Sequence, residues 1–309
     1  MKAKNFFKDI FPFNNREDMP APLYIIKKLL AFFLILTVST FVAEGVTIVG
    51  HLIAGYNPLM GEMLPLDVMQ LIKYYGYALF IVITFIYCRV FEKRKLSTLG
   101  FNKKVYDYLA GGVLAVLLLA VIIGVCCLTG TMSFGGMVSG FDGLYIVLLL
   151  FGFVIQGAME EVMCRGFLLT SLKKKMSLPL AIFVSSTAFA IPHLPTVLSA
   201  DPVFALVGVV NLYLVSAVFS LLFVLRSNIY IVCGLHSIWN FVLNGAIGLS
   251  VSGTESNANS LMKINVNAEN LLSGGAYGIE ASIITTAVLT VAVAVFGIIC
   301  YKRGEKNGL

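Results

Sequence analysis

The chain has 309 residues, of which 59% are hydrophobic and only 12% are charged. Soluble domains are about half apolar and a quarter charged, so this composition excludes an ordinary soluble enzyme and indicates a membrane protein. The net charge of +6 does not indicate a nucleic-acid partner, because the basic residues stand beside apolar segments, where they set membrane topology.

Apolar segments long enough to cross a bilayer recur along the whole chain. A helix needs about 20 such residues to span the hydrocarbon core. We therefore predict an all-α fold, a polytopic membrane bundle of about eight transmembrane helices. In chain order the segments are Leu23–Ala54, Val68–Phe91, Tyr108–Thr129, Gly143–Leu172, Leu178–Leu198, Val203–Leu225, Ile229–Leu249 and Gly278–Tyr301.

The charges between these segments predict their orientation. Lys and Arg gather in alternate loops and near both ends of the chain, whereas the intervening loops 57–67, 130–142 and 199–202 contain none. Short loops rich in Lys and Arg stay in the cytoplasm. We predict a multi-pass protein of the cell membrane, surrounded by lipid, with both termini in the cytoplasm.

This layout divides the chain into five parts. The loop after the seventh segment is rich in Asn, Ser and Gly, which predicts disorder on the outer side of the membrane. The parts are a cytoplasmic N-terminal tail (1–22), N-terminal transmembrane helices (23–142), a motif-bearing transmembrane core (143–249), an extracytoplasmic loop (250–277), and the last helix with its cytoplasmic tail (278–309).

The fourth segment contains ionisable residues that a membrane span normally lacks. They are Glu160, Glu161 and Arg165, and a charge at the bilayer centre costs roughly 2.5–3.5 kcal/mol even on the lenient insertion scale. Glu161 and Arg165 are four residues apart, so they share a helix face and can pair, which would fix the helix and balance charge. Glu160 points about 100° away from Glu161 and is free to face another helix.

Two later segments carry polar side chains at the same helical spacing. Phe189 and His193 share a face in the fifth segment, where Pro192 predicts a kink. His236 and Asn240 share a face in the seventh segment. Three polar pairs on nearby spans predict one shared functional site.

The residue types at this site suit hydrolysis by an activated water. A buried carboxylate beside an imidazole can act as a general base, which assigns that role to Glu160 and the holding of the water to His193. His236 and Asn240 would donate hydrogen bonds to the oxyanion of a tetrahedral intermediate. Glu160, His193 and His236 are also three potential ligands of a catalytic zinc with a fourth position for water, so zinc stays open as a cofactor.

Other functions use the same buried polar residues. A membrane transporter or proton relay would use them as a pathway, although the chain lacks an internal repeat. A non-enzymatic membrane scaffold or immunity protein would use them only to stabilise the bundle. The His-Glu-x-x-His signature of zinc proteases is absent from the sequence.

The motifs together carry a resemblance to a known family. Glu160-Glu161-x-x-x-Arg165, Phe189-x-x-x-His193 and His236-x-x-x-Asn240, in this order, resemble the CPBP family of CAAX proteases and bacteriocin-processing enzymes, also called Abi proteins. The stretch 274–280 is similar to bacterial members, and the motif-bearing core covers about a third of the chain.

That resemblance implies an intramembrane endopeptidase acting on a membrane-associated peptide or protein. Its site residues would be Glu160, His193, His236 and Asn240. The family has been described both as metalloproteases and as glutamate proteases, so the resemblance leaves a metal-bound and a glutamate-activated water equally open. Nothing in the sequence selects for a prenylated substrate.

Overall fold

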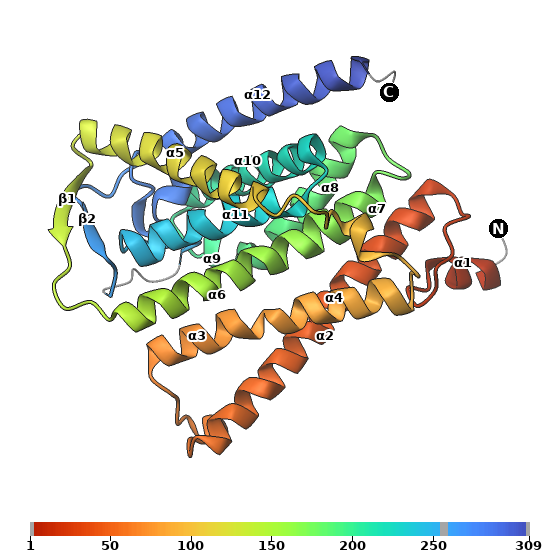
Figure 1. Ribbon diagram of the computed structural model, residues 1–309, viewed down its shortest axis with the longest axis horizontal. Coiled ribbons are helices and arrows are strands. Elements are labelled where there is room, and N and C mark those ends of the chain that lie inside the picture. Colours follow the sequence, from red (N-terminus) through yellow and green to blue (C-terminus); the bar gives the residue numbers. More distant parts are fainter. Residues whose placement is uncertain (1–2, 254–258, 307–309) are drawn as a thin grey trace.

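The computed structural model describes residues 3–253 and 259–306, and it is a bundle of long helices (Figure 1). Within these residues, eight helical segments are long and apolar enough to cross a membrane. Each one overlaps a predicted segment, so the predicted fold class is confirmed. The segments are Ala21–Ile53, Leu66–Val90, Asp107–Leu128, Gly143–Leu172, Leu178–Val197, Pro202–Arg226, Ile229–Ala246 and Ile283–Gly304.

Several of these spans consist of more than one helix. The N-terminal helix α1 (Ala3–Ile10) precedes them and is too short to cross a bilayer. The elements that form the spans are α2 (Ala21–Ile53), α3 (Leu66–Gly76) with α4 (Ala78–Val90), α5 (Asp107–Leu128), α6 (Gly143–Glu161) with α7 (Thr170–Leu172), α8 (Leu178–Ala190) with α9 (Leu194–Val197), α10 (Pro202–Arg226), α11 (Ile229–Phe241) and α12 (Ile283–Lys306).

The breaks within spans have local causes. Pro192 has no N–H to donate, and the chain passes through a 3-10 turn at Ile191–His193 between α8 and α9, as the sequence predicts. A π-helical segment, Val162–Leu169, joins α6 to α7, and a second, Val242–Ala246, ends α11. π-Helical turns inside α-helices occur frequently at functional sites. The first of these follows Glu161 and contains Arg165, and the second begins two residues after Asn240.

Helix α11 lies inside the bundle and packs most extensively against α5 and α6. Two glycines allow the approach to α5. A Cβ atom on Gly111 would lie 1.9 Å from the Ile231 carbonyl oxygen, and one on Gly234 would lie 2.0 Å from the Tyr108 carbonyl oxygen. Small residues at a helix interface let two backbones meet in a membrane, so these glycines fix the position of the helix that carries His236 and Asn240.

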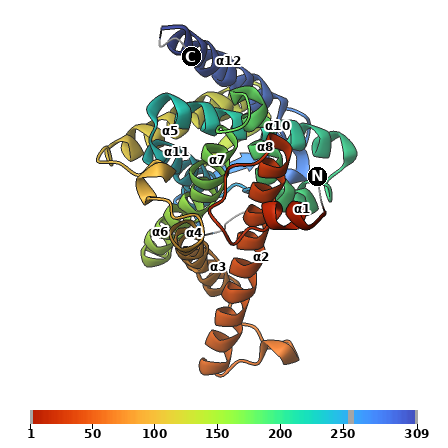
Figure 2. The same cartoon turned by 90° about the vertical axis from the view of Figure 1, so that its right-hand side faces the viewer.

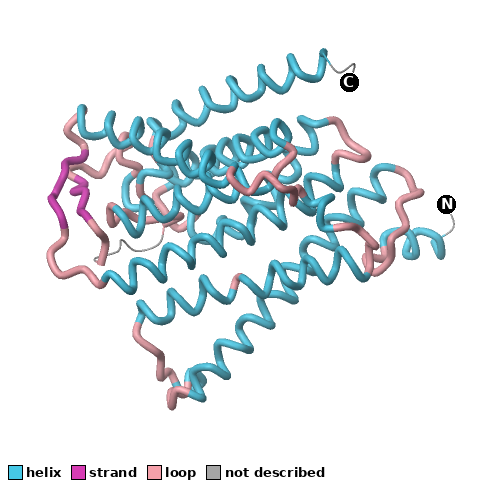
Figure 3. Tube along the Cα trace, in the orientation of Figure 1, coloured by secondary structure: helices cyan, strands magenta, loops and turns pink. Residues whose placement is uncertain are grey.

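A small antiparallel sheet closes one end of the bundle (Figure 3). Strand β1 (Met132–Met137) pairs with β2 (Met262–Val266), and the register joins Met132 to Val266 and Met137 to Met262. The prediction of a disordered 250–277 loop is therefore wrong for residues 262–266, where apolar and polar residues alternate as a strand requires. Residues 254–258 of that loop lie outside the described part of the chain.

The two ends of the bundle differ in what they hold. Both chain termini lie at the end opposite the sheet, which agrees with an even number of spans (Figure 1). Toward the loop 54–65, helix α2 leaves the bundle, and most of its side chains there are exposed (Figure 2). A groove of about 720 Å³ lies between this part of α2 and helix α3.

Candidate active site

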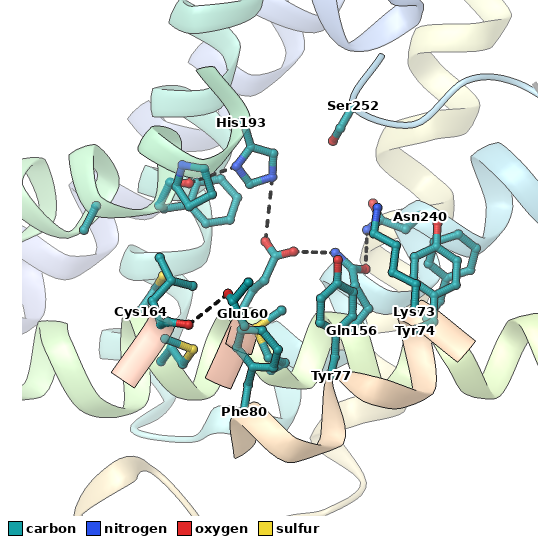
Figure 4. A pocket seen from close by; sticks show the side chains of 18 of the residues that line it. Lys73, Tyr74, Tyr77, Phe80, Gln156, Glu160, Cys164, His193, Asn240 and Ser252 are labelled. Atoms are coloured by element: carbon teal, nitrogen blue, oxygen red, sulfur yellow. Dashed lines mark hydrogen bonds and ion pairs between the residues drawn. The ribbon is translucent and has the colours of Figure 1, made fainter. Parts of the chain in front are cut away.

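Three of the predicted site residues meet around one carboxylate oxygen. Glu160 lies near the end of α6, His193 lies in the 3-10 turn after α8, and His236 lies in the middle of α11. The Nε2 atoms of His193 and His236 are each 3.9 Å from Oε2 of Glu160 (Figure 4 shows the His193 contact). That oxygen accepts no hydrogen bond from the described residues. The structure thus brings together groups that are distant in the sequence.

The other ring nitrogen of each histidine is already in use. Nδ1 of His193 is 2.9 Å from the Phe189 carbonyl oxygen, and Nδ1 of His236 is 2.9 Å from Oε1 of Glu161. Carbonyl and ionised carboxylate oxygens only accept hydrogen bonds, so each Nδ1 carries a proton. Both rings therefore present Nε2 to Glu160. The four-residue spacing of Phe189 and His193 has a physical reason, because the Phe189 carbonyl oxygen accepts from Nδ1 and so orients the His193 ring.

Glu161 and Arg165 form the predicted ion pair, completely buried and 3.0 Å apart. The Arg165 guanidinium also donates to Ser216, at 2.6 Å to Oγ and 3.1 Å to the carbonyl oxygen. It packs against the rings of Phe189 and Phe219, with centroids at 4.8 and 5.1 Å. A buried charge needs such partners. The same Oε1 of Glu161 that pairs with Arg165 also orients His236, a contact the sequence did not predict.

A glutamine outside the three sequence motifs, Gln156, holds the candidate base. Gln156 Nε2 donates to Oε1 of Glu160 at 2.5 Å, and Gln156 Oε1 accepts from Asn240 Nδ2 at 2.7 Å. Since the carboxylate only accepts, it fixes the orientation of the Gln156 amide. The sequence feature that indicates this contact is the spacing: Gln156 stands four residues before Glu160 in an apolar span, so both side chains lie on one helix face.

Asn240 thus has a partner that differs from the predicted one. The sequence places it with His236 as an oxyanion donor, whereas one N–H of its amide is directed to Gln156. The amide has two N–H groups, so the second is available to another acceptor. Asn240 also lines the cavity at Glu160.

The candidate site opens into a cavity of about 350 Å³ between the helices. Glu160, His193 and Asn240 line it, whereas His236 lies behind them and is 6% exposed. The groove between α2 and α3 adjoins the cavity, because Thr40, Lys73, Tyr74, Tyr77 and Phe80 line both. Sites for small molecules and peptides have this size and mixture of apolar walls and few polar groups.

Comparison with known proteins agrees with the resemblance of the motifs. Residues 142–242 match a family model described as type II CAAX prenyl endopeptidase Rce1-like. This segment is similar to the CAAX protease family. The match covers about a third of the chain, from α6 to the end of α11, and contains Glu160, His193, His236 and Asn240. No curated protein matches the chain.

The geometry of the Rce1-like segment also bears on the zinc that the sequence leaves open. A tetrahedral zinc at about 2.0–2.2 Å from its nitrogen and oxygen ligands would bring them within roughly 3.5 Å of each other. The nitrogen–oxygen separations are 3.9 Å, and the described residues contain no group of three or more His, Cys, Asp or Glu arranged to hold a metal. A water at hydrogen-bond distance, about 2.8 Å, bridges these separations directly. The residues as placed fit a water more closely than a tetrahedral metal.

Proposed function

We propose that this chain is an intramembrane endopeptidase that cleaves a membrane-associated peptide or protein with a water activated by Glu160. The observation that carries the proposal is the convergence of two Nε2 atoms on Oε2 of Glu160, which accepts no hydrogen bond from the described residues and lies at the edge of a cavity among membrane spans. The CAAX protease family match supports the same class of reaction.

The charges at the site assign a proton to one histidine. Glu160, Glu161 and Arg165 supply two negative charges and one positive, so one protonated imidazole makes the site neutral. His236 is the better placed ring, because it contacts Glu161 at 2.9 Å and faces Glu160. A carboxylate beside an imidazole stabilises its protonated form. His193 directs its Nδ1–H at a neutral carbonyl, which leaves its Nε2 to accept a hydrogen bond.

This distribution of protons matches the hydrogen bonds of one water. The water donates one hydrogen to Oε2 of Glu160 and the other to Nε2 of His193, and its oxygen accepts from Nε2–H of His236. Glu160 removes the first proton as the water oxygen attacks the carbonyl carbon of the scissile peptide bond. Gln156 holds the other carboxylate oxygen, which keeps Oε2 directed at the water.

The tetrahedral intermediate needs donors for its oxyanion. Nε2–H of His236 and the second N–H of Asn240 supply them, and each such donor typically contributes about 100- to 1000-fold in rate. Glu160 then passes its proton to the leaving nitrogen, and the carbon–nitrogen bond breaks. The immediate products are a carboxylic acid and an amine, and Glu160 returns to its ionised form. The proton of the new carboxyl group then passes to the amine, which gives a carboxylate and an ammonium group.

Cleavage of membrane-anchored reporter peptides by the purified protein in detergent tests the proposal. Prenylated peptides are the first reporters, because the matched family model is described by that substrate class, with unprenylated peptides for comparison. Glu160→Gln and His193→Ala should lose at least about 100-fold in rate, while Glu269→Gln, an exposed carboxylate away from the cavity, should not. Full cleavage by Glu160→Gln would contradict the proposal.

Repeating the cleavage assay with a strong chelator distinguishes a glutamate-activated water from a metal-bound water. Activity that survives a strong chelator and needs Glu160 supports the glutamate-activated water. Activity that is lost on chelation and restored by zinc would replace it with a metal-bound water held by Glu160, His193 and His236. A proton relay or a membrane scaffold would leave every reporter uncut while the wild-type protein remains folded.

A further inference from the structure

One face of α3 is polar although the helix belongs to a membrane span. Gln70, Lys73, Tyr74 and Tyr77 recur at the spacing i, i+3, i+4 and i+7, which places them on one stripe. Gln70 lines the groove between α2 and α3, and the other three line both the groove and the cavity at Glu160. The polar stripe therefore faces the space that leads to the candidate site.

Lys73 stands out in this stripe because its charge has no partner. Among the described residues it is the single Lys or Arg that lines either space, and its side chain forms no hydrogen bond or ion pair with any of them. Basic residues within other spans have partners, since Lys27 donates to Asn14, Lys28 pairs with Glu92, and Arg165 pairs with Glu161. An ionisable residue inside a membrane span is costly and marks a substrate pathway more often than a structural contact.

The position of Lys73 narrows what it can bind. Glu44 and Asp67 line only the outer groove, whereas Lys73 also lines the inner cavity together with Glu160. Figure 4 shows Lys73 on the side of Glu160 where Gln156 and Asn240 lie, away from His193. Since neither Glu44 nor Asp67 forms an ion pair with Lys73, one ammonium group is left to pair with one negative charge, and the anions of a peptide are carboxylates.

We propose that Lys73 binds a carboxylate of the substrate peptide next to the scissile bond and so determines which peptides are cut. The inference rests on the peptidase function proposed above and adds a specificity residue to it. The carboxylate has two sources, the free C-terminus of the peptide or an Asp or Glu side chain. Both present the same group to Lys73, and the experiment distinguishes them.

Binding is measured first, in the Glu160→Gln protein, so that no cleavage intervenes. Fluorescent membrane-anchored peptides are compared in two pairs: free acid against amide at the C-terminus, and Glu against Gln within the chain. One pair should differ by about 10- to 100-fold in Kd, as a charge-assisted hydrogen bond predicts. Adding Lys73→Met should remove the difference. Adding Lys175→Met, an exposed lysine in the loop before α8, should leave it unchanged.

Cleavage by protein with Glu160 intact gives a second readout. Lys73→Met should raise KM for the acidic peptide by the same factor with little change in kcat, and Lys73→Glu should invert the preference. Lys73→Arg should restore it, which separates loss of the charge from loss of folding. Equal discrimination by wild type and Lys73→Met, or the absence of discrimination in both pairs, would overturn the inference. Cleavage that does not need Glu160 would instead overturn the proposed function and leave the binding result standing.

Discussion

At the scale of single residues, one oxygen of Glu161 serves both the fold and the chemistry. It pairs with Arg165 at 3.0 Å and accepts from His236 at 2.9 Å. Glu161→Gln should lower the unfolding free energy by about 3–5 kcal/mol, because it leaves the Arg165 charge buried without its counterion. Cleavage should also be lost. Thermal unfolding in detergent and reporter cleavage measure the two effects.

A double variant separates these two roles of Glu161. Replacing the whole pair by apolar residues of similar size is often neutral for stability, so Glu161→Leu with Arg165→Met should unfold close to the wild-type temperature. It should remain inactive, because Nδ1 of His236 still lacks its acceptor. Recovery of cleavage together with stability would show that Glu161 acts only on the fold.

Gln156 gives a prediction about positioning. Gln156→Leu removes the donor to Oε1 of Glu160 and the acceptor for Asn240, while retaining similar volume. We expect kcat to fall about 10- to 100-fold with KM little changed, because the variant loosens the base while a side chain of similar size keeps its place in the cavity wall. Steady-state kinetics on one reporter peptide measure this. An increase confined to KM would indicate that Gln156 contacts substrate instead.

The contrast between these residues shows what the sequence could predict. The pair Glu161–Arg165 followed from spacing alone, because residues four apart in a helix are neighbours. The contact of Glu161 with His236 joins helices 75 positions apart in the chain, and the helix period does not specify it. Gln156 was missed because an uncharged amide in a span is a weaker signal than a carboxylate.

At the scale of elements, the close contact of α5 and α11 positions half of the candidate site. Gly234→Ala would bring a Cβ atom to 2.0 Å from the Tyr108 carbonyl oxygen, so the two helices must separate. Overpacking of this kind costs about 1–3 kcal/mol. We expect lower thermal stability and reduced cleavage, since His236 lies two residues further along α11.

A matched substitution on α5 provides the control for this packing prediction. Gly124 has no atom within 4 Å of the place where a Cβ would lie, so Gly124→Ala should be neutral or slightly stabilising. Gly111→Ala, on the same helix, should behave like Gly234→Ala, because its Cβ would lie 1.9 Å from the Ile231 carbonyl oxygen. Equal effects of Gly111→Ala and Gly124→Ala would contradict the packing argument.

The elements also differ in how far the sequence predicts them. The spans followed from apolar length, since a bilayer requires satisfied backbone hydrogen bonds over a fixed thickness. The pairing of β1 with β2 could not be predicted from the sequence, because the two strands are separated by four spans and each is only five or six residues long. The π-helical segments were also not predicted, since their extra residue per turn leaves no sequence signature.

At the scale of the whole molecule, the residues that line the cavity and the groove indicate the end of the bundle from which we expect substrate to arrive. Leu66 and Asp67 at the start of α3, Thr196 in α9, and Ser252 after α11 line the cavity or the groove. Helix α3 begins, and α9 lies, toward the end of the bundle opposite the chain termini (Figure 1). If the termini are cytoplasmic, as the distribution of Lys and Arg predicts, the candidate site is reached from the extracytoplasmic side.

Labelling of single cysteines in intact cells tests this orientation. In a variant without the six native cysteines, Ser139→Cys in the loop after β1 should react with a membrane-impermeant maleimide. Lys103→Cys, between α4 and α5, should react only after the membrane is permeabilised. Both positions are exposed in the structure, so unequal labelling reports the side of the membrane rather than burial. The reverse pattern would place the groove in the cytoplasm, and with it the pool of peptides that reaches Lys73 and Glu160.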